Sequence, residues 1–204
     1  MTPIPWILTA LLGAAPPPPS ADAHLLSGAE AFRAGSYAAA LVEFRVAERM
    51  GSGEASWYAA ASLVKLGRAE DAVEGFALAE RTSGAAHDVL LDYYRALACY
   101  QARLYLCADR WLQASGARAG PRVSAQATAL REAIARELGT AKLPVAIDVF
   151  LARASEVSVP RPALALVYAE EAAALAARTP DAHRAVESRA LIQRLQLTVV
   201  GGRQ

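Results

Sequence analysis

The chain has 204 residues, and its 21 lysines and arginines balance 20 aspartates and glutamates to a formal net charge of +1. A nearly neutral chain without a dense basic run has no positive stripe for a phosphate backbone, so we expect no nucleic-acid partner. Apolar residues make up 54% of the chain but aromatic residues only 7%, and alanine is frequent throughout. This composition favours closely packed helices and predicts an all-α fold.

Residues 1–23 have the features of a signal peptide or leader. A short apolar run, Trp6 to Ala15, precedes four prolines and then Ala21-Asp22-Ala23, a small-x-small pattern typical of cleavage before His24. The run is about half the ~20 residues that a bilayer requires, so we expect no integral membrane span in the mature chain. The sequence predicts an exported, periplasmic or envelope-associated protein. No lysine or arginine precedes the run, and the alternative is a cytoplasmic protein that keeps its leader.

An internal repeat follows the leader. Residues 31–47 align without gaps on residues 63–79, and four pairs recur at one offset of 32 residues: Gly35/Gly67, Ala40/Ala72, Phe44/Phe76 and Ala47/Ala79. Glycine accepts the positive φ that ends one helix and turns the chain into the next. The alanines and the phenylalanine share one helix face, where small side chains admit a neighbouring helix. The pattern predicts a repeated helical hairpin.

These residues resemble the tetratricopeptide repeat family. The first unit matches the family at Gly28, Gly35, Tyr37, Ala40, Phe44 and Ala47, and the second at Ala60, Gly67, Ala72, Phe76 and Ala79. A third unit follows at an offset of about 36 residues, with Ala96, Tyr105, Ala108, Leu112 and Ser115 in corresponding places and Arg103 where the turn glycine would be. The resemblance implies a right-handed α-solenoid of about three helix pairs over residues 24–120. It implies an architecture and says little about function.

Residues 121–197 are predicted to form capping and additional helices. Repeat arrays expose an unfinished apolar face at each end, and residues 122–138 carry an apolar stripe at helical spacing that would cover it. Residues 143–160 fit either a helix or a strand hairpin, and the helix is favoured because an isolated hairpin would leave backbone groups unpaired. Two more helices are predicted, from Pro162 to Arg178 and from Thr179 to Gln196, followed by a disordered tail, 198–204.

No pattern in the sequence indicates an enzyme, a metal site or a cofactor. The histidines, His24, His87 and His183, are far apart, and none has a carboxylate or thiolate at the spacing of a metal site. Neither a phosphate-binding loop nor a serine elbow nor a zinc-protease helix occurs. Glu170 and Glu171 point about 100° apart on a helix, so we expect a solvated edge and not a catalytic pair.

The two cysteines flank the third turn. Cys99 falls late in the first helix of that unit and Cys107 early in the second, so an antiparallel turn brings them near the same level. In an oxidising compartment they could form a disulfide that stabilises the fold by ~2–3 kcal/mol. Helix axes about 8–10 Å apart make the required Cα spacing demanding. The alternative is two small buried hydrophobic side chains.

The resemblance also implies a binding surface. In tetratricopeptide arrays the first helix of each unit lines a concave groove. The ligand-facing positions of the family correspond here to Leu25 and Val64 and to the site that we predict: Phe32, Arg33, Trp57, Lys65, Tyr93, Tyr100 and Gln101. Aromatic rings predominate, and the lysines of a carboxylate clamp are absent, so we expect an amphipathic helix or an extended apolar segment of another protein. The alternative is that these rings pack within the array.

The sequence thus predicts a protein-protein interaction adaptor or scaffold. The leader favours an exported protein that docks on a cell-envelope or secretion assembly. The alternative is a cytosolic chaperone or assembly factor with the same fold.

Overall fold

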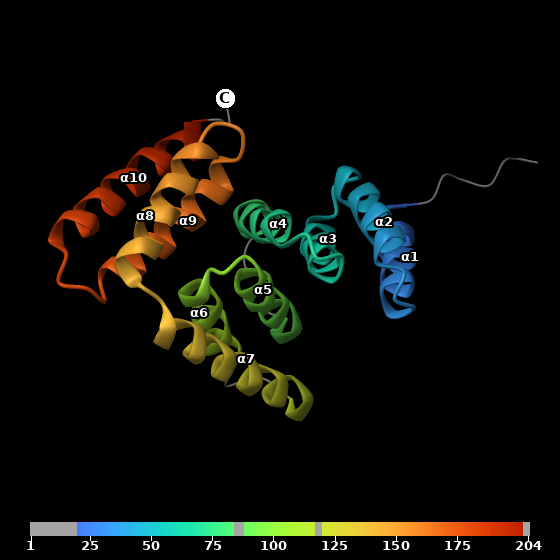
Figure 1. Cartoon of the computed structure of the whole chain (residues 1–204). Coiled ribbons are helices and arrows are strands. Elements are labelled where there is room, and N and C mark those ends of the chain that lie inside the picture. The colour runs from blue at the N-terminus through green and yellow to red at the C-terminus, as the bar shows by residue number, and fades with distance from the viewer. Residues whose placement is uncertain (1–19, 84–87, 117–119, 202–204) are drawn as a thin grey trace, which may run out of the picture.

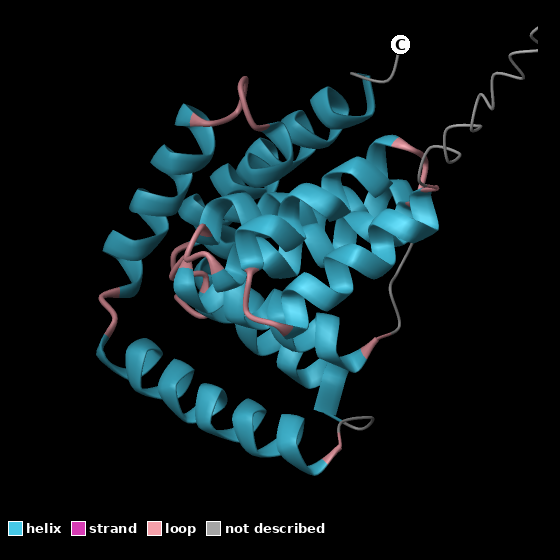
Figure 2. Ribbon diagram, turned by 90° about the vertical axis from the view of Figure 1, so that its right-hand side faces the viewer, coloured by secondary structure: helices cyan, strands magenta, loops and turns pink. Residues whose placement is uncertain are grey.

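The computed structural model describes residues 20–83, 88–116 and 120–201. Within these ranges the chain forms ten α-helices and no strand (Figure 1, Figure 2). The helices are α1 (Ala21–Arg33), α2 (Tyr37–Arg49), α3 (Gly53–Lys65), α4 (Ala69–Ser83), α5 (Val89–Gln101), α6 (Tyr105–Gly116), α7 (Pro121–Thr140), α8 (Leu143–Glu156), α9 (Pro162–Ala176) and α10 (Ala182–Gly201). The all-α prediction is confirmed, and the ambiguous segment after residue 143 forms the helix α8.

Helices α1 to α7 alternate between two sides of an array. Each of these helices packs against the next one along the chain, and α1, α3, α5 and α7 also contact each other in sequence. We call these four helices the odd-helix row. Figure 1 shows the successive pairs α1/α2, α3/α4 and α5/α6 side by side. The predicted packing of helices in consecutive pairs is therefore present.

The three turns within these pairs share one backbone conformation. Gly35 has φ 79°, Gly67 has φ 71° and Arg103 has φ 62°. In each turn the next residue donates its N–H to a carbonyl five residues earlier, the bond that ends many helices. Glycine adopts this left-handed conformation freely, whereas an arginine does so at a cost of about 1 kcal/mol.

The repeated residues fill the contacts between the helix pairs. Those of α2, α4 and α6 are each at most 1% exposed: Ala40, Phe44, Ala47, Ala72, Phe76, Ala79, Ala108, Leu112 and Ser115. Alanine lets the helices approach closely, and the larger side chains occupy the space that remains. The repeat in the sequence is therefore a repeat of core positions.

The last three helices do not extend the array. α7 ends the odd-helix row, and the chain then turns back so that α9 lies on α4 and α6 while also contacting α8 and α10. In Figure 1 these C-terminal helices stand beside the array, on the side of α4 and α6. The predicted capping helix, 122–138, corresponds to α7, and the predicted additional helices correspond to α8–α10. The cause of this departure from the array is α9, which is buried around most of its circumference and packs against four neighbouring helices.

Charged side chains hold α8 and α9 against the start of α4. We call Glu70, Asp71 and Glu74 the α4 carboxylates. Arg161 lies 2.6 Å from Glu74 and 2.8 Å from Asp71, and Arg153 lies 2.9 Å from Glu70. The Tyr168 hydroxyl donates to Glu70 at 2.6 Å. Burial alone would raise the pKa of Glu70, but Tyr168 and Arg153 outweigh it and lower that pKa.

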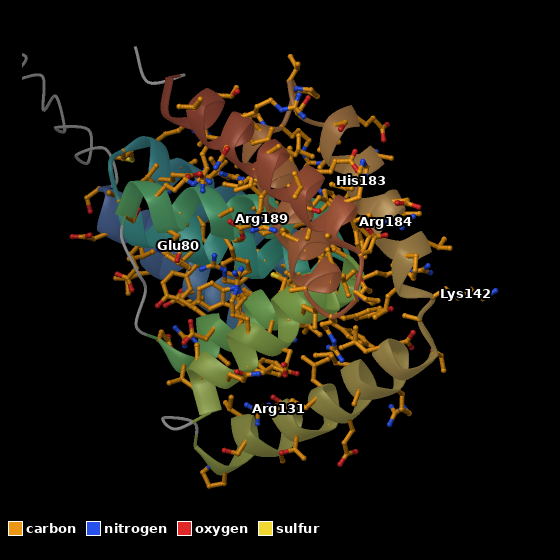
Figure 3. The ribbon with its side chains drawn as sticks, turned by 90° about the vertical axis from the view of Figure 1, so that its left-hand side faces the viewer. Glu80, Arg131, Lys142, His183, Arg184 and Arg189 are labelled. Atoms are coloured by element: carbon orange, nitrogen blue, oxygen red, sulfur yellow. A yellow bond between two sulfur atoms is a disulfide. The ribbon has the colours of Figure 1, made fainter. Side chains whose placement is uncertain are left out.

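A second ion pair joins the outer helices of this group. Arg184 of α10 contacts both carboxylate oxygens of Asp148 on α8, at 2.7 and 2.8 Å, and it also pairs with Asp181 (Figure 3). Because Asp148 is exposed, forming the pair removes little charge from water, and an exposed ion pair of this kind contributes little to the free energy of unfolding. Its main effect is to link α10 to α8.

The chain ends differ from the predicted boundaries. α1 begins at Ala21, where the Ser20 hydroxyl accepts a hydrogen bond from the Ala23 N–H at 3.2 Å, so the predicted leader overlaps the first turn of α1. Residues 1–19 of the leader lie outside the described residues. α10 continues past Gln196 to Gly201, and the rest of the predicted tail, 202–204, also lies outside. Among the described residues, no helix combines the length and apolar character needed to cross a bilayer.

The packing of α1 on α2 can be tested at Gly28. A Cβ at this position would lie 2.7 Å from the buried ring of Phe44, so we expect Gly28→Ala to lower the free energy of unfolding by ~1–3 kcal/mol. Gly139→Ala is the control, because its added Cβ meets no atom within 4 Å, and it should stabilise α7 by ~0.5–1 kcal/mol. Urea unfolding measures both. Equal stability of the two variants would contradict the α1–α2 contact.

Candidate functional site

An aromatic cluster occupies the odd-helix row. Phe32 of α1 places its ring edge-on to Tyr37 at 5.2 Å and to Tyr94 at 5.8 Å between centroids. The Lys65 ammonium lies 5.3 Å from the Tyr94 ring centroid and 5.8 Å from that of Tyr37. The Tyr93 ring lies 6.1 Å from Tyr94. We call these five residues the aromatic cluster. It brings together three predicted residues, Phe32, Lys65 and Tyr93, that lie on three different helices.

Two of its members were missed by the site prediction. Tyr37 was identified only as a repeat residue, and Tyr94 is the neighbour of a predicted residue on α5. The Tyr94 ring of α5 contacts both Phe32 of α1 and Lys65 of α3. That contact depends on tertiary packing, and sequence spacing did not reveal it.

Three other predicted residues lie at the ends of α1 and α5. Arg33 and Gln101 are exposed, and Tyr100 is half-buried. The Tyr100 ring contacts Tyr105 of α6 at 5.8 Å between centroids. Tyr100 therefore packs at the α5–α6 turn, against a residue that is not part of the aromatic cluster.

Trp57 is a core residue, as in the alternative that the rings pack within the array. Its side chain is only 4% exposed, its ring lies 6.0 Å from Phe76, and the Arg95 guanidinium lies 6.0 Å from the ring. α3 is enclosed by α2, α4 and α5, so most of its positions are buried. A ring in this place offers a partner almost no surface.

The aromatic cluster combines apolar area with positive charge. Burial raises the pKa of Tyr93, so its hydroxyl stays neutral at physiological pH and can donate a hydrogen bond. Lys65 and Arg33 carry positive charges at the exposed ends of α3 and α1. Such a surface can bind an apolar segment that carries an acidic side chain.

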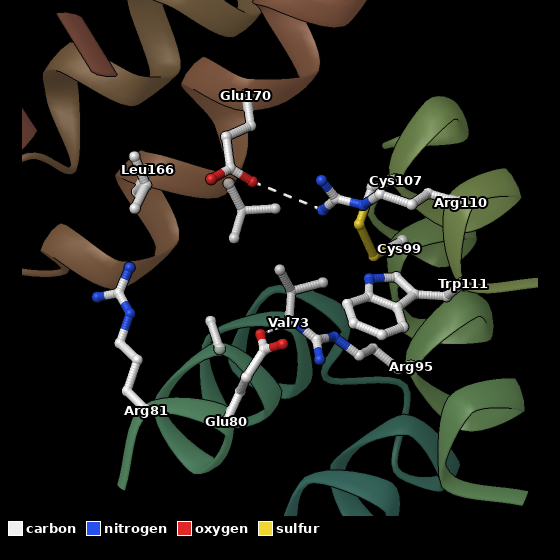
Figure 4. A pocket seen from close by; sticks show the side chains of 12 residues that line it. Val73, Glu80, Arg81, Arg95, Cys99, Cys107, Arg110, Trp111, Leu166 and Glu170 are labelled. Atoms are coloured by element: carbon white, nitrogen blue, oxygen red, sulfur yellow. Dashed lines mark hydrogen bonds and ion pairs between the residues drawn. A yellow bond between two sulfur atoms is a disulfide. The ribbon is translucent and has the colours of Figure 1, made fainter. Parts of the chain in front are cut away.

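A polar cavity lies on the other side of α5, between α4, α6 and α9 (Figure 4). Its volume is about 310 Å³. The Arg95 guanidinium stacks on the Trp111 ring at 3.5 Å and donates to Glu80 at 2.6 Å, while Arg110 lies 3.5 Å from Glu170. Burial lowers the pKa of Arg95, and Glu80 opposes this shift. The first pair joins α5 to α4, and the second joins α6 to α9.

A disulfide forms one wall of this cavity. Cys99 and Cys107 are bonded, with their Cα atoms 5.9 Å apart. They lie close to the α5–α6 turn, one on each side of it. Here the two backbones are close enough for the Cα spacing that a disulfide requires. The bond closes the third hairpin covalently.

Glu171 is buried, which corrects the expectation of a solvated edge. Its side chain is 3% exposed, and its carboxylate accepts the backbone N–H groups of Leu106 at 2.8 Å and of Cys107 at 2.7 Å. Burial raises the pKa of Glu171, and these two hydrogen bonds offset the shift only in part. The first turn of α6 has no acidic residue and follows Leu104, which cannot cap it, so α9 supplies the missing acceptor.

The described histidines stand apart from these sites. His24 Nδ1 lies 2.7 Å from Glu43, and His183 is exposed on α10. His87 lies outside the described residues. Within the described ranges no group of three or more histidine, cysteine, aspartate or glutamate side chains is arranged to hold a metal ion.

Comparisons with protein-family models, with curated proteins and with solved structures found no match. The resemblance to tetratricopeptide repeats therefore remains an expectation that rests on the repeated residues.

The role of Glu171 gives a pH-dependent prediction. Its pKa is higher in the folded chain than the ~4.3 of an unfolded glutamate. At a pH between these two values the folded chain therefore binds more protons than the unfolded chain, and it loses stability as the pH rises from ~4.3 through the folded-state pKa. Glu171→Gln cannot titrate, so its stability relative to the wild type should improve between pH ~4 and ~7. Denaturant unfolding at several pH values measures this.

Glu171→Ala is the companion variant. It removes the acceptor of two buried N–H groups, and we expect it to lose ~2–4 kcal/mol at pH ~4. Because alanine cannot titrate either, this loss relative to the wild type should become smaller as pH rises, as for the glutamine variant. A pH dependence of the glutamine variant equal to that of the wild type would show that Glu171 does not titrate as described.

Proposed function

We propose that this chain is an adaptor or scaffold that binds another protein through the odd-helix row. The observation that supports this most is the position of the aromatic cluster. α9 packs on α4 and α6, so the C-terminal helices cover these two helices and not the odd-helix row, where Phe32, Lys65, Tyr93 and Tyr94 of the cluster lie. Its member Lys65 and Arg33, the neighbour of Phe32 in the chain, are exposed.

The chemistry of this surface favours a partner segment of one kind. Tyrosine and phenylalanine rings offer large contact areas with little loss of side-chain entropy, and two cations favour acidic side chains beside them. We therefore propose an amphipathic helix or an extended apolar segment with acidic residues. The alternating contacts of α1 to α7 and the left-handed turns support a tetratricopeptide-like solenoid as the scaffold for it.

The disulfide supports an exported location. Disulfides persist in oxidising compartments and are rare in the cytosol, where thiols stay reduced. We propose that the chain acts in the periplasm or envelope, docked on an envelope or secretion assembly. Cleavage before His24 would remove the Ser20 cap and the start of α1, so a cleavage site upstream of Ser20 would preserve the helix better.

The state of the cysteines tests this location. Protein alkylated during extraction from its native host should carry no label on Cys99 or Cys107 before reduction, and sequencing should find a shortened N-terminus. In vitro, Cys99→Ala/Cys107→Ala should lower the free energy of unfolding by ~2–3 kcal/mol. Labelled cysteines on a chain with its leader intact would favour the cytosolic chaperone or assembly factor.

The binding surface is tested by charge reversal. We expect Lys65→Glu/Tyr93→Ala to lose a partner that co-purifies with the wild type, because both side chains belong to the aromatic cluster. Arg189→Glu is the matched control, since Arg189 is exposed on α10, away from that cluster (Figure 3). Circular dichroism confirms equal helicity of the two variants.

The partner is then purified and titrated. Its affinity should fall at least about tenfold for the cluster variant and stay unchanged for Arg189→Glu. Equal affinity for both variants would overturn the assignment of the odd-helix row.

A further inference from the structure

A second, apolar cavity opens where α8 leaves α7. Its volume is about 450 Å³, and it lies between the α5–α6 turn, the end of α7, α8 and α9. Its lining is mainly aliphatic and aromatic, and includes Leu138, Ala146, Val149, Phe150 and Leu175. A cavity of this size falls within the ~300–1,000 Å³ range of small-molecule sites. It exists because α7 and α8 diverge, and it is separate from the aromatic cluster.

The exposed apolar surface beside this cavity continues along α8. Val145 and Val149 are each 57% exposed and stand one turn apart on the same helix face. Val149 also lines the cavity. An aliphatic chain lying in the cavity would cover this strip.

Arg103 contributes a positive charge to the lining. It is exposed, and within the described residues it forms no ion pair. The other charged groups of the lining are engaged: Arg153 with Glu70 and Glu156, Glu171 with the N–H groups of α6, and Glu137 with the Tyr105 hydroxyl at 3.3 Å. Arg103 is therefore the cation of the lining that is left to meet an anionic ligand, and Glu137 is the one carboxylate of the described lining that no cation or backbone N–H engages.

The backbone conformation of Arg103 is a second indication that its side chain binds a ligand. Its φ is 62°, in the conformation that Gly35 and Gly67 adopt in the two preceding turns. A bulky residue in this region is strained, and such strain is found most often where the side chain serves a function. A glycine would make the same turn, but it would leave the cavity without its unpaired cation.

We propose that this cavity binds a long-chain aliphatic carboxylate. The chain would lie among Leu138, Val149 and Phe150, and the carboxylate would accept two hydrogen bonds from the Arg103 guanidinium. The headgroup is singly charged, because one unpaired arginine matches one carboxylate and the nearby Glu137 would repel a doubly charged phosphate.

The test is a calorimetric titration of the full chain with sodium laurate below its micelle concentration. Laurate should bind at one site per chain. 1-Dodecanol, which has the same chain length without the charge, should bind at least about tenfold more weakly, and dodecyltrimethylammonium should not bind. Failure of laurate to bind, or equal binding of the alcohol, would overturn the proposal.

Arg103→Gly separates this role from a structural one. The variant relieves the backbone, so its melting temperature should be no lower than that of the wild type, yet its affinity for laurate should fall at least about tenfold. Arg136→Ala, which removes an exposed arginine of α7 outside the cavity lining, should bind as the wild type does. Val149→Asp places a charge in the path of the chain and should also abolish binding. Unchanged laurate affinity in Arg103→Gly would refute the site.

Discussion

A helix that is apolar around most of its circumference must be largely enclosed, and α9 imposes this requirement on the helices around it. It contacts α4, α6, α8 and α10. Its two buried polar groups then need partners of their own: Glu171 accepts the free N–H groups of α6, and Tyr168 donates to Glu70 of α4. Each bond also stabilises a group of the partner helix. The first turn of α6 has no cap of its own, and Glu70 is one of the three neighbouring α4 carboxylates. The position of α9 is thus set by polar satisfaction as much as by apolar burial.

The placement of α9 decides which surfaces remain for binding. With α4 and α6 covered, the odd-helix row stays free of α8–α10, and Lys65 and Arg33 are exposed on it. The same turn of the chain separates α8 from α7 and opens the apolar cavity beside Arg103. Both proposed sites therefore follow from one departure from a regular repeat array.

The helix pairs could be predicted from the sequence because their signals are local. Gly35 and Gly67 mark left-handed turns, and Phe44 and Phe76 mark buried positions, as the structure has them. The burial of Trp57 and Glu171 could not be predicted, because both depend on helices far away in the chain. An amphipathic pattern shows that a face is buried but not what covers it. The alanines spread around α9 were the one sequence signal that this helix is central.

The link between α9 and the array also bears on synthesis by the ribosome. A simple repeat array contacts only its neighbours and can fold from its first unit onward. Here Ala40, Phe44, Ala47, Ala55 and Ala59 form a small core of their own, so α1, α2 and α3 can pack early. The bonds from Glu171 to α6 and from Tyr168 to Glu70 span 64 to 98 residues. The middle of the array therefore stays incomplete until almost the entire chain has emerged, and its apolar side needs protection during that interval.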